Sequence, residues 1–130
     1  MHVKQAVPFF SVANIEASSR WYIDRLGFTM KLSWRPGGKL EWCWLEIGDA
    51  ALMLQEYHKP MVGTLGLGVN ICFVCDDAIA FYREAKARGV DAKRPSVGNG
   101  MWVTSMADPD GYQLYFESVT DAAEETELEE

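Results

Sequence analysis

One structural pattern occurs twice along the chain, and this repeat limits the folds open to it. An apolar strand-like run, a helix that ends at a glycine and three further strand-like runs are found twice, offset by about 62 residues. The pattern predicts an α+β fold of two tandem βαβββ modules, about residues 6–55 and 69–118, with a linker at 56–68. Neither four-stranded sheet can bury its open face alone. We therefore expect a single domain, 1–118, in which the modules form a curved eight-stranded mixed sheet with the helices outside.

The first copy contains the most clearly marked helix. Asn14 is a suitable N-cap, and Gly27 can adopt the positive φ that ends a helix, so we expect a helix over Ile15–Leu26. Its buried stripe follows helical spacing and consists of Ile15, Ser19, Tyr22 and Leu26. Strands are expected at residues 6–12, 29–35, 40–47 and 51–55.

The second copy repeats these elements with a shorter helix stripe. Asp76 or Asp77 is the expected N-cap, and Gly89 ends the helix. The expected helix face consists of Ala78, Phe81, Tyr82 and Ala85. Strands are expected at residues 69–75, near Ala92, at 100–107 and at 112–117, with a tight turn at 108–111.

Acidic residues outnumber basic ones by 19 to 12, and six of the acids lie in the last ten residues. Residues 119–130 are therefore predicted to form an acidic, disordered tail. The remaining body is nearly neutral, which excludes non-specific nucleic-acid binding, because that requires clustered Lys and Arg. No apolar run reaches the ~18 residues of a membrane span, and no signal-peptide pattern is found, so we expect a cytoplasmic protein without membrane contact.

The three cysteines do not fit a disulfide framework, because their number is odd. Cys72 and Cys75 form a CxxC pattern within a strand-like run. Their odd separation places the two side chains on opposite faces of a strand, where they share neither a metal nor a bridge. We expect buried free thiols.

Several short motifs lie at a defined spacing along the two copies. They are Asn14, Ser18, Trp21-Tyr22, Leu26-Gly27-Phe28 and the turn Asp108-Pro109-Asp110-Gly111-Tyr112. Together they resemble the motifs of the vicinal oxygen chelate superfamily, which includes glyoxalase I, extradiol dioxygenases and bleomycin-resistance proteins. The resemblance covers about residues 6–118, and residues 76–83 and 86–89 look closest to the bleomycin-resistance-like, antibiotic-binding branch.

The resemblance also indicates where a metal would be bound. Enzymes of the superfamily hold a divalent ion through one His, Gln or Glu on the first and last strand of each copy. Here those positions fall on Val7, Asn70, Tyr115 and either Met53 or Leu54. These side chains do not suit Zn, Ni or Fe. The sequence therefore predicts neither a metal nor another cofactor, which argues against an enzyme.

The strands carry aromatic side chains instead, and strand alternation gives part of their orientation. Five tryptophans are many for 130 residues, and Trp42 and Trp44 share a strand face. Glu46 shares that face whereas Glu41 does not, so a carboxylate can meet a cationic ligand over the rings. Aromatic walls suit planar or amphipathic ligands. The expected ligand-binding residues are Phe9, Ser11, Trp34, Trp42, Trp44, Asn70, Trp102 and Tyr115.

Three functional hypotheses remain open. The first is a metal-free protein that sequesters a small aromatic or amphipathic, antibiotic-like molecule; the resemblance implies that it is a homodimer. The second is a metal-dependent lyase, isomerase or dioxygenase of the same superfamily that recruits His58, Glu56 and Glu117. The third is a dimer whose aromatic residues are used in packing, without a ligand.

Overall fold

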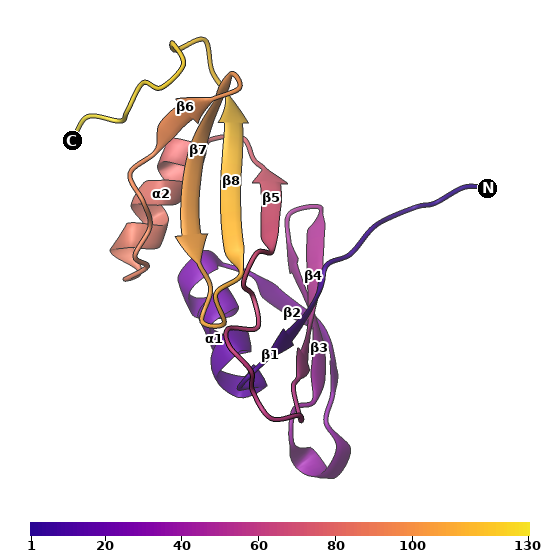
Figure 1. Cartoon of the computed structure of the whole chain (residues 1–130). Helices are drawn as coiled ribbons and strands as arrows, with labels where there is room; N and C mark the ends of the chain where they lie inside the picture. The colour runs from indigo at the N-terminus through magenta and orange to yellow at the C-terminus, as the bar shows by residue number, and fades with distance from the viewer. The chain divides into compact units, whose positions relative to one another are not determined.

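The computed structural model describes all residues, 1–130, and divides them into two compact units, Met1–Gly66 and Leu67–Glu130. Each unit is one βαβββ module with a four-stranded mixed sheet and one α-helix (Figure 1). The strand order is β1-β4-β3-β2 in unit 1 and β5-β8-β7-β6 in unit 2. The first and last strands of each module are parallel neighbours, and the remaining pairs are antiparallel. The predicted α+β class and the duplicated module are confirmed.

Unit 1 follows the predicted order, with strand bounds within three residues of those expected. Gly37 and Gly38 both take positive φ in the turn after β2, where the chain reverses. The elements in chain order are β1 (Phe9–Val12), α1 (Ile15–Leu26), β2 (Thr29–Trp34), the 3-10 helix η1 (Pro36–Gly38), β3 (Trp42–Ile47) and β4 (Ala50–Glu56).

Helix α1 begins and ends as its sequence predicts. The side chain of Asn14 accepts a hydrogen bond from the backbone N–H of Ala17 at 3.1 Å, and Gly27 ends the helix at φ 85°. The helix buries Ile15, Ser18, Ser19, Tyr22 and Leu26 against one face of the sheet. That face contributes fully buried side chains of Val12, Cys43, Leu45, Leu52 and Leu54.

Unit 2 differs from the prediction at one strand. The short strand expected near Ala92 is wrong: Ala92 is buried in an irregular segment, and the strand follows it at Ser96–Gly98. The elements in chain order are β5 (Asn70–Val74), α2 (Ala78–Ala87), β6 (Ser96–Gly98), β7 (Met101–Ala107) and β8 (Gln113–Val119).

Helix α2 covers one face of this second sheet. Asp77 is the N-cap, and its carboxylate accepts the N–H of Ala80 at 2.9 Å. The ring of Phe81 stacks on Phe116 with centroids 3.9 Å apart, and Tyr82 is only 2% exposed. Neither helix of the protein has the length and apolar character required to cross a bilayer.

The C-terminal residues lie beside β6 (Figure 1). Ser96 forms an antiparallel bridge with Glu127, and Val97 donates its backbone N–H to the carbonyl of Thr126 at 2.8 Å. Residues 119–130 are expected from their composition to be a disordered tail. The structure gives part of this segment backbone hydrogen bonds to β6. Pairing to a strand edge depends on backbone groups and tolerates charged side chains.

Candidate ligand-binding site

The sheet of unit 1 has one face that α1 does not cover, and strand pairing determines which residues share it. Met53 of β4 lies opposite Phe9 of β1 and Trp44 of β3. Trp44 in turn lies opposite Leu32 of β2. Phe9, Met53, Trp44 and Leu32 therefore form one apolar row across all four strands.

A second row lies beside the first. Gln55 is opposite Ser11 and Trp42, and Trp42 is opposite Trp34. The side-chain amide of Gln55 donates to the hydroxyl of Ser11 at 3.2 Å. This row is aromatic at one end and polar at the other. We call the two rows together the aromatic face: Phe9, Met53, Trp44, Leu32, Ser11, Gln55, Trp42 and Trp34.

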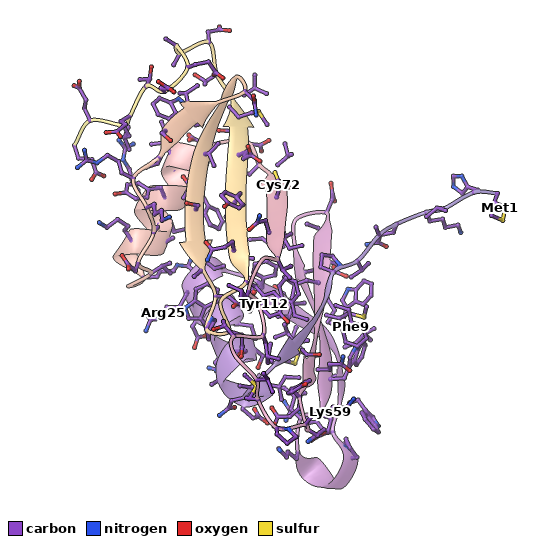
Figure 2. The ribbon with its side chains drawn as sticks, in the orientation of Figure 1. Met1, Phe9, Arg25, Lys59, Cys72 and Tyr112 are labelled. Atoms are coloured by element: carbon purple, nitrogen blue, oxygen red, sulfur yellow. The ribbon has the colours of Figure 1, made fainter.

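The aromatic face is open, in contrast to the face beneath α1. Phe9 is 49% exposed, Leu32 57% and Trp34 60%, whereas the side chains beneath α1 are nearly or fully buried. Figure 2 labels Phe9 on the first sheet. Large apolar side chains gathered on one exposed face cost hydration free energy and mark a surface that contacts a ligand or a partner. The core of unit 1 does not bury these aromatic side chains, so they can contact a ligand or a partner.

A carboxylate borders the aromatic face. Glu46 is on the same side of β3 as Trp44, and Trp44 donates its indole N–H to Glu46 Oε2 at 2.8 Å. This hydrogen bond orients the indole and holds a negative charge beside the apolar rows. The face predicted for Glu46 is confirmed.

Two other glutamates of the same strands lie on the opposite side and have structural partners. Glu56 Oε1 accepts the first N–H of α1, from Ile15, at 2.7 Å, and Glu56 Oε2 accepts a hydrogen bond from Lys39 Nζ at 2.9 Å. Burial acts to raise the pKa of Glu56, but these hydrogen bonds and the charge of Lys39 outweigh it and lower the pKa. Glu41 forms a short contact with His58. These carboxylates stabilise the start of α1 and the adjoining loop.

The uncovered face of unit 2 is more polar. Cys72 of β5 lies opposite Tyr115 of β8, which lies opposite Ser105 of β7. Cys72 donates to the carboxylate of Glu117, and burial together with this carboxylate raises the pKa of the thiol to about 11. As a residue Cys72 is exposed, with its thiol only partly desolvated, whereas Cys43 is buried and Cys75 is half-buried. The expectation of buried cysteines is therefore correct for Cys43 and wrong for Cys72, which Figure 2 labels. Cys72 is exposed because it lies on the strand face opposite α2.

The structure brings most of the predicted binding residues into two groups. Phe9, Ser11, Trp34, Trp42 and Trp44 lie together on the aromatic face of unit 1. Asn70 and Tyr115 share the uncovered face of unit 2. Trp102 lies on the other face of that sheet, because it is opposite Val97 and Ser118 on the side that α2 covers.

Sequence reasoning did not single out Leu32, Met53 and Gln55 as binding residues. A signal for Leu32 was present, since it precedes Trp34 by two residues and must share its strand face. A β-bulge between Met30 and Leu32 changes the side on which the earlier part of β2 points. Such a bulge has no clear sequence signature here.

A sequence model of the glyoxalase/bleomycin resistance protein/dioxygenase superfamily matches residues 2–116. The chain belongs to this superfamily. The match covers most of both modules, so the family resemblance drawn from the helix and turn motifs is confirmed. No curated protein sequence matches the chain significantly.

Several solved structures have the same fold as this superfamily member. The bleomycin resistance determinant encoded on transposon Tn5 has 22% sequence identity and a TM-score of 0.71, over 93% of this chain and 100% of that one. TnmS3, an antibiotic binding protein from Streptomyces sp. CB03234, has 20% identity and a TM-score of 0.69, over 92% and 100%. TioX from Micromonospora sp. ML1 has 17% identity and a TM-score of 0.71, over 92% and 99%. At these identities the likeness establishes the fold.

The side chains at the superfamily's metal positions do not fit a divalent cation. Leu54 is fully buried on the side of α1, so the uncovered position on β4 belongs to Met53. Val7 and Met53 offer unit 1 no oxygen or imidazole ligand. Asn70 and Tyr115 give unit 2 an amide and a phenol, which are poor ligands for Zn, Ni or Fe. No group of three or more His, Cys, Asp or Glu side chains lies in an arrangement that could hold a metal ion.

The alternative ligand set suggested by the sequence consists of residues with other partners. Glu56 binds the first turn of α1 and Lys39. His58 contacts Glu41, and Glu117 accepts a hydrogen bond from Cys72. Binding a metal through these groups requires breaking those contacts.

Proposed function

We propose that this superfamily member is a binding protein that holds a small planar aromatic or amphipathic molecule on the aromatic face and does not transform it. The observation that carries the proposal is the exposure of Phe9, Leu32 and Trp34 in register with Trp42 and Trp44. Tryptophan supplies a large, rigid apolar surface with one polar group, which suits stacking on a planar ring system. The face offers capture by stacking rather than by a metal.

The charge at the border of the face supports a cationic group on the ligand. The hydrogen bond from Trp44 holds the carboxylate of Glu46 at the edge of the indole. A ligand that stacks on Trp44 would therefore have this negative charge beside it. A positive group on the ligand could then form an ion pair with the carboxylate and a cation–π interaction with the adjacent ring. Two structural neighbours are described as a bleomycin resistance determinant and an antibiotic binding protein, which supports an antibiotic-like ligand.

Asn70 and Tyr115 of unit 2 are proposed as further ligand-binding residues on their own sheet, and the protein is proposed to act as a homodimer. Both side chains belong to the uncovered face of their sheet. Trp102 is left out of this proposal because it lies on the side of α2. The large exposed apolar side chains of unit 1 also favour dimerisation, because their burial against a second chain would stabilise the dimer.

A thermal-shift screen with planar and glycopeptide antibiotics, bleomycin included, tests the proposal. A compound that binds only the native state stabilises it by about 2.7 kcal/mol at a hundredfold excess over its Kd, which raises the Tm. We expect the shift to be lost in Trp34→Ala and kept in Trp21→Ala, because Trp21 is on α1. The same compounds should remain chemically unchanged after incubation.

Two results would contradict the proposal. An absence of any shift across the panel, together with a dimer that dissociates in Trp34→Ala, favours use of the aromatic residues in packing alone. Near-stoichiometric Zn, Ni, Mn or Fe by elemental analysis, with turnover of a test compound, favours the metal-dependent enzyme.

A further inference from the structure

The outer edge of β6 is occupied by the C-terminal segment of the same chain. Val97 donates its N–H to the carbonyl of Thr126 at 2.8 Å and accepts the N–H of Glu125 at 2.9 Å. Leu128 donates its N–H to the carbonyl of Pro95 at 2.9 Å. Together with the isolated antiparallel bridge between Ser96 and Glu127, these bonds pair part of the segment with the edge of β6. The pairing starts at a turn, in which Thr126 donates its N–H to the carbonyl of Ala123 and Glu125 has a φ of 66°.

The turn that follows β6 binds a carboxylate of this segment. Asn99 and Gly100 have φ of 54° and 73°, so both residues of this tight turn are in the left-handed region. Their backbone N–H groups donate to the two carboxylate oxygens of Glu124, at 2.6 Å and 3.1 Å. Successive N–H groups that converge on one anion form a nest, and a charged acceptor strengthens both hydrogen bonds. The turn is therefore a built anion site.

Partial burial of Leu128 and a hydrogen bond to Glu130 extend the pattern along the segment. Leu128 is half-buried, while its neighbours Glu127 and Glu129 are exposed. Tyr82 of α2 donates its hydroxyl to Glu130 Oε2 at 3.2 Å. Three side chains of the bound segment are thus recognised: the carboxylate of Glu124, the apolar side chain of Leu128 and the carboxylate of Glu130.

We propose that the edge of β6 and the Asn99-Gly100 turn form a binding site for an acidic peptide that begins with a turn and then pairs with β6, and that residues 124–130 of the same chain fill this site. Backbone pairing to the strand edge gives affinity, and the carboxylate bound by the Asn99-Gly100 turn gives specificity. The site is separate from the aromatic face and does not depend on the proposed ligand.

A competing acidic peptide has to displace the chain's own segment. The link between the end of β8 and Glu124 is only four residues long, Thr120–Ala123, which gives the segment a high effective concentration at its site. Three backbone hydrogen bonds to Pro95 and Val97, the two hydrogen bonds of the Glu124 carboxylate and the one from Tyr82 to Glu130 hold the segment there. When it leaves, β6 presents unpaired N–H and carbonyl groups, which a competing acidic strand can pair with.

Amide hydrogen exchange and a peptide titration on the full-length chain test this site. In Glu124→Gln, exchange at Asn99 and Gly100 should accelerate at least about tenfold, because a neutral amide replaces a bidentate carboxylate. The N–H of Ala80, which Asp77 accepts on α2, is the internal control and should not change. Unchanged exchange at Asn99 and Gly100 overturns the proposal.

The titration uses a synthetic peptide of residues 121–130. We expect it to bind the Glu124→Gln chain about tenfold more tightly than the unmodified chain, whose own segment competes better, with saturable NMR shifts at Val97, Asn99 and Gly100. The same peptide with Gln in place of Glu124 should bind at least about tenfold more weakly. Equal binding of a scrambled peptide of the same composition, or no shift at these amides, contradicts a strand site and indicates at most a non-specific charge effect.

Discussion

Unit 1 and unit 2 have the same element order and strand pairing, but the sheet faces that their helices leave uncovered carry different side chains. In unit 1 that face holds three tryptophans, a phenylalanine, a leucine and a methionine. In unit 2 the corresponding face carries Asn70, Cys72, Ser105, Gln113 and Tyr115 among its residues. The duplicated module therefore fixes the scaffold, while the chemistry of the uncovered face diverges between the copies.

The two helices also begin differently. In unit 1 the first N–H of α1 is accepted by the carboxylate of Glu56, at the end of β4. In unit 2 the equivalent N–H of Ala78 is accepted at 2.8 Å by the hydroxyl of Ser118, on β8. The last strand of each module thus caps the helix of that module, with a charged acceptor in one unit and a neutral one in the other.

The largest effect should come from the core, where the units are equivalent. Tyr22 of α1 is fully buried and packs edge-to-face on Phe28 with centroids 5.3 Å apart, and Tyr82 of α2 is 2% exposed. We expect Tyr22→Ala and Tyr82→Ala each to lower the free energy of unfolding by about 3–5 kcal/mol, measured by urea denaturation. Arg20→Ala, an exposed position on α1, is the control and should change it by less than about 0.5 kcal/mol. A loss below about 1 kcal/mol at only one tyrosine would break the equivalence of the two cores.

The next effect should separate the uncovered faces. Trp42→Ala is expected to weaken binding of a compound found in the screen about thirtyfold, or about 2 kcal/mol, because it removes the centre of an aromatic row. Tyr115→Ala, which removes a ring from the polar face of unit 2, should weaken it several-fold less. Isothermal titration calorimetry on both variants measures the ratio. A larger loss in Tyr115→Ala would move the main contact to unit 2.

The smallest effect should distinguish the helix starts by their response to pH. The folded pKa of Glu56 is lowered, so its stabilisation is fully present above the unfolded pKa and is lost as the pH falls through the folded pKa. We expect Glu56→Gln to cost about 1 kcal/mol at pH 7 and clearly less at pH 3, by urea denaturation. Ser118→Ala should cost a similar amount at both pH values, since a hydroxyl does not titrate there.

A control for the pH effect is Glu84→Gln, which removes an exposed i,i+4 pair with Arg88. Its cost should stay within about 0.5 kcal/mol at pH 7. If Glu56→Gln behaves in the same way, the carboxylate adds nothing to the start of α1 beyond a neutral cap.

Local signals in the sequence were sufficient for the helices and for most strands. Asn14, Asp77 and Gly27 each predict a helix end through their own hydrogen-bonding or backbone properties, and the structure places them there. The strand expected near Ala92 lies four residues later, at Ser96–Gly98, because Ala92 is buried by packing of an irregular segment rather than by strand pairing. Asn-Gly at residues 99–100, between two strand-like runs, is the strongest turn signal in this region and locates β6 immediately before it.

The site was less accessible to sequence reasoning because it depends on register. Alternation placed Trp42, Trp44 and Glu46 on one face correctly, since they belong to one strand. It could not relate Trp34 to Trp42 across strands, and it did not separate Trp102 from them. The alternation of buried Thr104 and Met106 with half-exposed residues fixes the side of Trp102, and burial of Thr104 is known only from the structure.

The C-terminal segment shows what composition alone does not predict. Six acidic residues in ten predict solvation, because charged side chains resist burial. Pairing with the edge of β6 uses backbone groups and one carboxylate, so it leaves most of these charges in water. Composition predicts whether side chains stay in water, but it does not predict this kind of backbone pairing.

The indole N–H signals of the five tryptophans provide the most direct test of the aromatic face as a ligand site. Selective ¹⁵N labelling of tryptophan allows all five to be followed by NMR during titration with a compound that stabilises the protein. We expect the signals of Trp34, Trp42 and Trp44 to shift and saturate together, while those of Trp21 and Trp102 remain in place. Saturable shifts confined to Trp21 and Trp102 would contradict this expectation.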